Sequence, residues 1–131
     1  WTNGPWGVDQ DSLSNGVAYG DLDNDVDLDL IVNNVNDPAC IYRNNANSKT
    51  QNNYLTVKFL GSNSIGTKVT LYAEKKILAR ENLPVRGFQS SVDTRLHFGL
   101  GSATTIDSMI VTWPDGAARR SRLRRAYGSQ L

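Results

Sequence analysis

Cysteine is almost absent from this chain of 131 residues, because Cys40 is the only one. A single thiol cannot form an internal disulfide, so the sequence excludes a disulfide-stapled fold. It equally excludes the zinc sites that are built from two or four cysteines. Histidine is as scarce, since His97 is the only imidazole, and no nucleophile motif accompanies it. Apolar residues alternate with His97, so we expect its side chain on the outer face of a strand.

Long apolar runs and a net charge are also missing. No stretch approaches the ~18 consecutive apolar residues of a membrane-spanning helix, so we expect no membrane span. The formal charge is +1, from 14 basic and 13 acidic residues, which argues against a strongly basic nucleic-acid module. This neutrality is a cancellation, because residues 1–116 carry 9 basic and 13 acidic residues and residues 117–131 carry 5 basic and no acidic ones. The chain therefore has an acidic body and a basic tail.

Helical periodicity is nearly absent as well, and short segments of alternating, β-branched and aromatic residues recur instead. We predict strands at Gly16–Gly20, Leu28–Val32, Ala39–Arg43, Tyr54–Leu60, Lys68–Ala73, Ile77–Glu81, Ser90–Val92, Leu96–Leu100 and Met109–Trp113. Strands at such short spacing favour an all-β fold, an antiparallel β-sandwich or a barrel-like domain. The polar stretch 45–53 holds no large apolar residue and is typical of a linker or surface loop.

The strongest chemical feature is a run of alternating aspartates: Asp21, Asp23, Asp25, Asp27 and Asp29. Five carboxylates in one tight loop repel one another unless a cation neutralises them. Ca²⁺ is suited to this role because it accepts about six to eight oxygen ligands in irregular geometry. Mg²⁺ prefers fewer protein ligands, and Zn²⁺ lacks its histidine and cysteine partners here. An EF-hand is excluded because Val26 and Val32 stand where that motif needs glycine and glutamate.

Other interpretations of the aspartate loop stay open at this point. The loop could be a solvated acidic segment, a degenerate metal loop that no longer binds, or a set of catalytic carboxylates without a metal. A hydrolase that acts on glycans would need two acids about 5–9 Å apart across a cleft. The only glutamates are Glu74 and Glu81, and both lie in polar strand or turn contexts. We therefore expect no enzymatic activity.

Segments Asn15–Asp25 and Asp27–Val32 together resemble the FG-GAP/VCBS repeat of integrin-type β-propellers and of secreted bacterial proteins. The resemblance implies a single propeller-type repeat hairpin, in which a Ca²⁺ loop joins two strands. It also implies ligation by the side chains of Asp21, Asp23, Asp25 and Asp29, and by the main-chain carbonyl of Asp27. Val26 departs from the family, which usually has glycine there. A β-branched residue is strained if this position needs a positive φ.

The second half resembles the ASPIC/UnbV domain, which is found in cartilage acidic protein and in bacterial relatives. The matching segments are Tyr54–Lys58, Ile65–Val69, Arg86–Ser91, Leu96–Gly101 and Val111–Gly116. The resemblance implies a β-domain without established catalysis, at the end of a longer extracellular protein with propeller-like repeats. We therefore predict a calcium-loop repeat over residues 1–45 and an ASPIC/UnbV-like β-domain over residues 54–131. Together they would form the C-terminal fragment of a larger secreted protein.

The basic tail holds five arginines: Arg119, Arg120, Arg122, Arg124 and Arg125. Such a run is typical either of the solvent side of an edge strand or of a contact with an anion. Few aromatic residues lie among the arginines, which argues against a platform for stacking nucleic-acid bases.

The patterns and the two resemblances together predict a non-catalytic, calcium-binding β-module, and the resemblances imply that it lies outside the cell, at the cell surface or in the periplasm. Its expected role is adhesion, or contact with carbohydrate or protein. The expected partners are neighbouring domains of a longer chain and an extracellular glycan or protein. The alternatives are a fragment of a hydrolase that acts on glycans and an anion-binding module that uses the arginine-rich tail.

Overall fold

The computed structural model describes residues 7–8, 10–60, 64–122 and 129–130. Within them the regular structure is β-strand, apart from the single-turn helix α1 (Ala46–Lys49) inside the polar stretch 45–53. The chain forms two compact units, each made of two segments. The first unit consists of the chain up to Ala46 together with Val85–Val92, and the second consists of Asn47–Pro84 together with the chain from Asp93 onward. The predicted all-β class is confirmed. No helix of the described residues is both long and apolar enough to cross a membrane.

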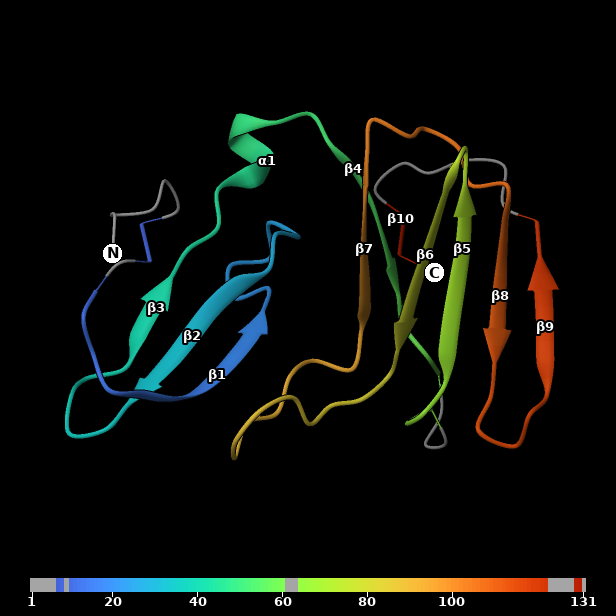
Figure 1. Ribbon diagram of the computed structural model, residues 1–131. Helices are drawn as coiled ribbons and strands as arrows, with labels where there is room; N and C mark the ends of the chain where they lie inside the picture. The colour runs from blue at the N-terminus through green and yellow to red at the C-terminus, as the bar shows by residue number, and fades with distance from the viewer. Residues whose placement is uncertain (1–6, 9, 61–63, 123–128, 131) are drawn as a thin grey trace. The chain divides into compact units, whose positions relative to one another are not determined.

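The first unit contains a three-stranded antiparallel sheet in the order β1 (Ser14–Gly20), β2 (Asp29–Asn34), β3 (Cys40–Tyr42). These strands run side by side, in blue to cyan, in Figure 1. Gly20 pairs with Asp29 at the end of the β1–β2 hairpin, so the aspartate loop is the connection between two adjacent strands. Leu30 pairs with Tyr42, which brings the end of β3 beside the start of β2.

Residues 85–92 belong to the first unit although they are remote from it in sequence. The predicted strand Ser90–Val92 is wrong, because this segment forms only an isolated bridge between Val85 and Ser91. A short segment that has too few backbone partners on a neighbouring strand does not form a strand, even where its residues favour the β conformation. The segment packs closely on β1, since a Cβ added to Gly16 would lie 3.0 Å from Ser90 Oγ and 3.2 Å from Phe88 O. The absence of a side chain at Gly16 therefore permits this approach.

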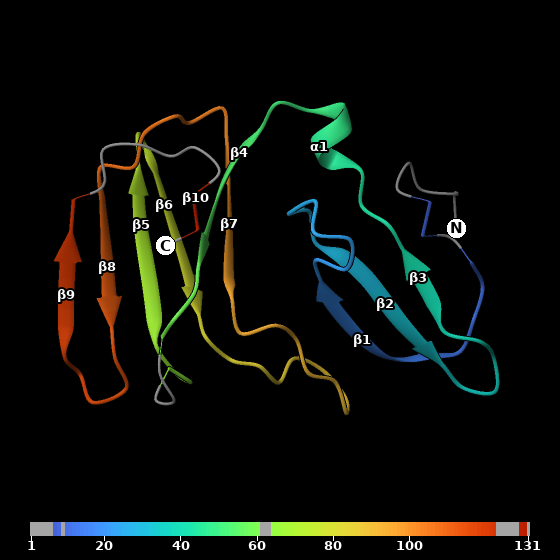
Figure 2. The same ribbon diagram turned by 180° about the vertical axis from the view of Figure 1, so that it is seen from behind.

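The second unit contains two sheets. One has the order β10-β4-β7 and the other the order β6-β5-β8-β9. The strands are β4 (Asn53–Val57), β5 (Lys68–Ala73), β6 (Lys76–Glu81), β7 (Leu96–Gly101), β8 (Ser108–Thr112), β9 (Ala118–Ser121) and β10 (Ser129–Gln130). Figure 2 shows β5, β8 and β9 side by side, with β9 at the outer edge. All pairs are antiparallel except β10 with β4, which is parallel.

Alternation along the strands of both sheets builds one hydrophobic core in the second unit. The buried members are Leu55, Val57, Val69, Leu71, Ala73, Leu96, Phe98, Leu100, Ala103 and Ile106. A core shared by two sheets is the arrangement of a β-sandwich. The strand predicted at Tyr54–Leu60 ends earlier, at Val57, and Leu60 is exposed. His97 is only partly buried while its neighbours Leu96 and Phe98 are in the core, so its predicted outward direction is confirmed.

Candidate metal centre

The loop between β1 and β2 contains two residues with left-handed backbone conformation, Asn24 at φ 61° and Val26 at φ 73°. Asparagine tolerates this conformation because its short side chain can form hydrogen bonds with the nearby backbone. A β-branched residue such as valine is sterically disfavoured there. Holding valine there costs about 1–3 kcal/mol and persists only where the surroundings determine the backbone. Position 26 thus has the positive φ that would strain a valine.

Three aspartates of this loop gather their carboxylates. Ligand oxygens of Asp21, Asp23 and Asp25 all lie within 4.8 Å of one another, a grouping that could hold a metal ion. Backbone amides of the same loop fix two of these side chains. The amide of Asp25 donates to Asp23 Oδ1 at 3.3 Å, and the amide of Asp27 donates to Asp25 Oδ1 at 2.9 Å. The alternating pattern thus directs three carboxylates to one place.

Asp21 supplies the oxygen that fits a cation best. Its Oδ1 atom is shielded from solvent and accepts no hydrogen bond within the described part of the chain. A buried carboxylate oxygen without a partner is costly, because it loses its hydration and gains nothing in exchange. A cation among the three carboxylates would provide that missing partner, and carboxylate oxygens are the ligands that hard divalent cations prefer. The residues present therefore fit a bound metal ion.

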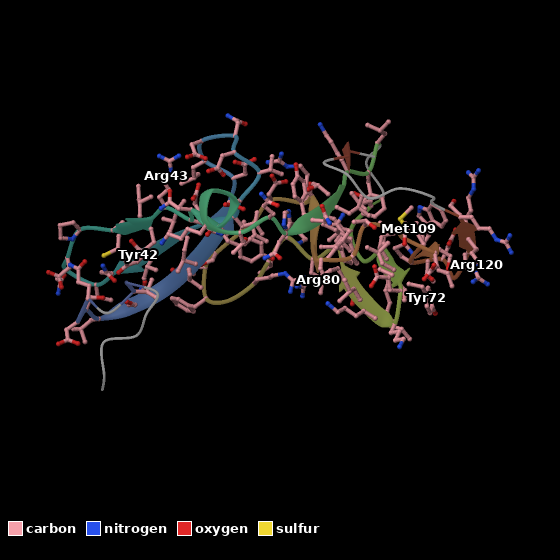
Figure 3. The ribbon with its side chains drawn as sticks, turned by 90° about the horizontal axis from the view of Figure 1, so that it is seen from above. Tyr42, Arg43, Tyr72, Arg80, Met109 and Arg120 are labelled. Atoms are coloured by element: carbon pink, nitrogen blue, oxygen red, sulfur yellow. The ribbon has the colours of Figure 1, made fainter. Side chains whose placement is uncertain are left out.

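Arg43, the first residue after β3, is the positive group nearest to this cluster that the structure describes. Its Nη2 atom lies 2.7 Å from Asp23 Oδ2 and 3.8 Å from Asp25 Oδ2. Its side chain is 65% exposed, and Figure 3 shows it extending outward from the end of β3. We did not predict Arg43 from the sequence. The signal was the predicted strand Ala39–Arg43, whose pairing with the strand after the loop would have placed its end beside Asp29.

Asp29, another predicted ligand, holds the loop shut. Its side chain is almost completely buried, and its two oxygens accept different backbone amides. Leu22 N donates to Oδ2 at 3.0 Å, and Asn44 N donates to Oδ1 at 2.8 Å. Asp29 is outside the group of carboxylates within 4.8 Å, and its role as a ligand stays a prediction. Asp27 is also buried, and its predicted main-chain contact likewise stays a prediction.

The arginines of the tail are placed only in part. Arg119 and Arg120 lie on β9, the edge strand, and both are exposed (Figure 3 labels Arg120). Arg120 Nη2 donates to Ser108 Oγ on β8 at 3.2 Å. Arg122 follows the strand and is exposed, whereas Arg124 and Arg125 lie outside the described residues. The prediction of an edge strand with exposed arginines is confirmed for Arg119 and Arg120, and an anion contact stays a prediction.

Comparison with known protein families gives one match. Residues 60–129 match the family described as ASPIC and UnbV, and they make up more than half of the chain. A comparison with curated proteins returned no match. The resemblance of the aspartate loop to the FG-GAP/VCBS repeat stays a prediction. By its second half, the chain belongs to the ASPIC and UnbV family.

Proposed function

We propose that this chain is a non-catalytic, calcium-binding β-module that acts outside the cell in adhesion, through contact with an extracellular glycan or protein. The observation that carries the calcium site is the buried, unpartnered Oδ1 atom of Asp21 beside the carboxylates of Asp23 and Asp25. These three side chains would hold the ion, with Asp29 and the main chain of Asp27 as the further expected ligands. When bound, the ion would neutralise the carboxylates and add stability.

The composition of the cluster favours Ca²⁺ over other metals. All of its side-chain donors are oxygens, and no histidine or cysteine is among them, which disfavours zinc. Mg²⁺ demands near-octahedral geometry and keeps several waters, whereas Ca²⁺ accepts the irregular donors of a loop. Extracellular calcium modules bind with Kd values of about 10⁻⁴–10⁻³ M, so even a strained loop would be useful outside the cell.

A hydrolase is the alternative that the positions of the acids disfavour. Glu74 lies at the β5–β6 turn, and Glu81 is the last residue of β6, where it pairs with Lys68. The rise of a strand is about 3.3 Å per residue, so the two glutamates are about 20 Å apart along the hairpin. A glycosidase pair needs about 5–9.5 Å. This separation disfavours Glu74 and Glu81 as the acid pair of a glycosidase.

A second alternative, an anion-binding role for the basic tail, is favoured by the exposure of Arg119 and Arg120 on an edge strand. Retention on heparin, compared between the whole chain and a variant that ends at residue 116, tests it. Equal retention of both would reject the tail as the binding element.

Thermal unfolding of the whole chain in excess Ca²⁺ and in EDTA tests the calcium site. An ion at about ten times its Kd adds about 1.4 kcal/mol, which is a rise in Tm of several degrees for a chain of this size. Asp21→Asn should abolish the rise. Asp37→Asn should leave it unchanged, because Asp37 is an exposed acid of the same unit outside the cluster. Equal Tm values in Ca²⁺ and EDTA for the unmodified chain would overturn the proposal.

A further inference from the structure

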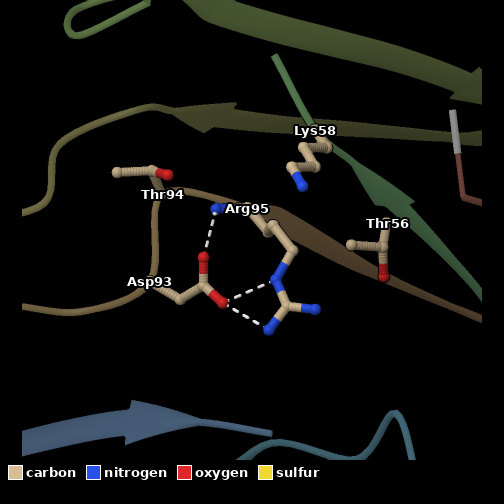
Figure 4. A pocket seen from close by; sticks show the side chains of 5 residues that line it. All are labelled: Thr56, Lys58, Asp93, Thr94 and Arg95. Atoms are coloured by element: carbon tan, nitrogen blue, oxygen red, sulfur yellow. Dashed lines mark hydrogen bonds and ion pairs between the residues drawn. The ribbon is translucent and has the colours of Figure 1, made fainter. Parts of the chain in front are cut away.

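A hollow lies in the second unit, away from the aspartate loop in sequence. It has a volume of about 190 Å³ and is lined by Thr56, Lys58, Asp93, Thr94 and Arg95 (Figure 4). Thr56 lies on β4 and Lys58 directly after it, while residues 93–95 lead into β7. The hollow therefore lies where these two paired strands meet their connecting segments.

Strand register explains why these side chains share one face. Thr56 pairs with His97 and Val57 pairs with Leu96, so Lys58 and Arg95 are the next opposed positions. Val57 and Leu96 point into the core, and side chains alternate along a strand. Lys58 and Arg95 are therefore on the outer face, with Thr56. Two cations opposed across an antiparallel pair destabilise it unless an anion is near.

The carboxylate of Asp93 interacts with both cations, with Arg95 through hydrogen bonds and charge and with Lys58 through charge. Asp93 Oδ2 accepts from Nε and Nη2 of Arg95 at 2.5 Å, and its Oδ1 accepts from the Arg95 amide at 2.9 Å. Burial alone would raise the pKa of Asp93, yet the hydrogen bonds and charge of Arg95, with the charge of Lys58, hold it below its ordinary value. Asp93 thus orders the guanidinium, and the lining keeps one positive charge in excess.

The remaining features of the hollow suit a small polar ligand with a carboxylate. Thr56, although only 6% exposed, lines the hollow, and its Oγ1 atom lies 3.3 Å from His97 Nδ1. His97 stacks on Tyr54 with ring centroids 5.5 Å apart, so aromatic rings continue the same face. The volume is below the ~300 Å³ at which pockets for drug-sized ligands begin, which limits the occupant to about one sugar residue.

We propose that this hollow binds the carboxylate of an acidic sugar, a uronic acid, through Lys58 and Arg95. Charge complementarity sets the sign of the ligand, because a monoanion would balance the single excess positive charge. The threonine hydroxyls would accept or donate hydrogen bonds to the sugar hydroxyls. The inference rests on the proposed role of the chain in binding an extracellular glycan, and it does not require the calcium site.

The test is a titration of the ¹⁵N-labelled whole chain with sodium glucuronate, followed by the amide shifts of Lys58, Thr94 and Arg95. We expect saturable shifts at these amides, and none with glucose at the same concentration. Lys58→Gln should weaken binding by about fivefold or more, because it removes one of two charge-assisted contacts. Lys68→Gln is the matched control, since Lys68 is exposed on β5 of the same unit. The affinity of this variant for glucuronate should stay within about twofold of that of the unmodified chain.

Sodium acetate and sodium sulfate distinguish the sources of the negative charge. Equal affinity for acetate and glucuronate, or saturation by sulfate alone, would show that the hollow accepts any small anion and would overturn the assignment to a sugar acid. An unchanged affinity in Lys58→Gln would also overturn it. The titration is run in EDTA and repeated in Ca²⁺. If glucuronate does not bind but Ca²⁺ still raises the Tm, this inference alone is refuted. If glucuronate binds but Ca²⁺ does not raise the Tm, only the calcium site is refuted.

Discussion

Arg43 and Asp23 form an ion pair in which Nη2 of the arginine lies 2.7 Å from Oδ2 of the aspartate. The same carboxylate belongs to the cluster that could hold a metal ion. The guanidinium and an ion would therefore compete for one carboxylate group, and Arg43 supplies positive charge to the loop when the ion is absent. Because Arg43 is largely exposed, its contribution to stability is small, about 0.2–1 kcal/mol at most.

Arg43→Gln should raise the affinity for Ca²⁺ by several-fold at low ionic strength, because the competing charge is removed while the carboxylates stay. Isothermal titration of both proteins with Ca²⁺ measures the change. Arg80→Gln is the control, since Arg80 is an exposed arginine on β6 and its removal should alter affinity little. An unchanged or weaker affinity in Arg43→Gln would contradict the competition.

Asp29→Ala should destabilise the metal-free chain by about 3 kcal/mol. The substitution leaves the amides of Leu22 and Asn44 without their charged acceptor in a buried place. Urea unfolding in EDTA measures this loss, and Asp37→Ala should change stability by no more than about 0.5 kcal/mol. A loss of stability that is seen only in the presence of Ca²⁺ would instead make Asp29 a ligand and nothing more.

Val26→Gly should stabilise the chain by about 1 kcal/mol, because glycine adopts a φ of 73° without the steric penalty that valine suffers. The same substitution at Val35, which is outside the residues with positive φ, should destabilise by about 0.5–1 kcal/mol. Urea midpoints of both variants provide the comparison. Destabilisation by both substitutions to a similar degree would show that the strain at Val26 is negligible.

Asp93→Asn should flatten the acid limb of the stability curve. The folded pKa of Asp93 lies below its ordinary value of 3.8, so the carboxylate contributes stability above that value and loses it as the pH falls through the lowered pKa. The free energy of unfolding of the unmodified chain should therefore exceed that of the variant by more at pH 7 than at pH 2. Urea unfolding at several pH values between 7 and 2 measures the difference. Asp107→Asn, a change of an exposed aspartate in the same unit, should not reproduce it.

Sequence periodicity predicted most strands because each buries one face and exposes the other. The alternation of Val69 and Leu71 with polar residues, and of Leu96 and Phe98 with His97, survives unchanged in the structure. Periodicity failed at residues 90–92, where tertiary contacts leave only one bridge. The parallel pair of β10 with β4 rests on two residues, too few to carry a pattern.

The site shows the same division between local and distant information. Alternation within one loop was enough to indicate that Asp21, Asp23 and Asp25 converge, because the loop is short and the residues are close in sequence. Arg43 and Asn44 reach the loop only through the pairing of β2 with β3. Their contacts with the loop depend on the order of the strands in the sheet, which a local sequence pattern does not predict. The hollow beside Thr56 was missed for the same reason, since its residues lie on or next to two paired strands that are far apart in sequence.

The first unit is discontinuous, because Val85–Val92 joins it from the far side of Asn47–Pro84. This arrangement has a kinetic consequence: the unit cannot complete itself until a long loop of chain has closed. The entropy cost of closure grows with the length of the free loop, and it falls once the intervening chain has become compact. Strands β4, β5 and β6 lie within that chain, and local hairpins such as β5–β6 form early. Folding should therefore proceed from the interior of the sequence outward, and a cut after Ala46 would leave the aspartate loop on a fragment that has lost part of its own scaffold.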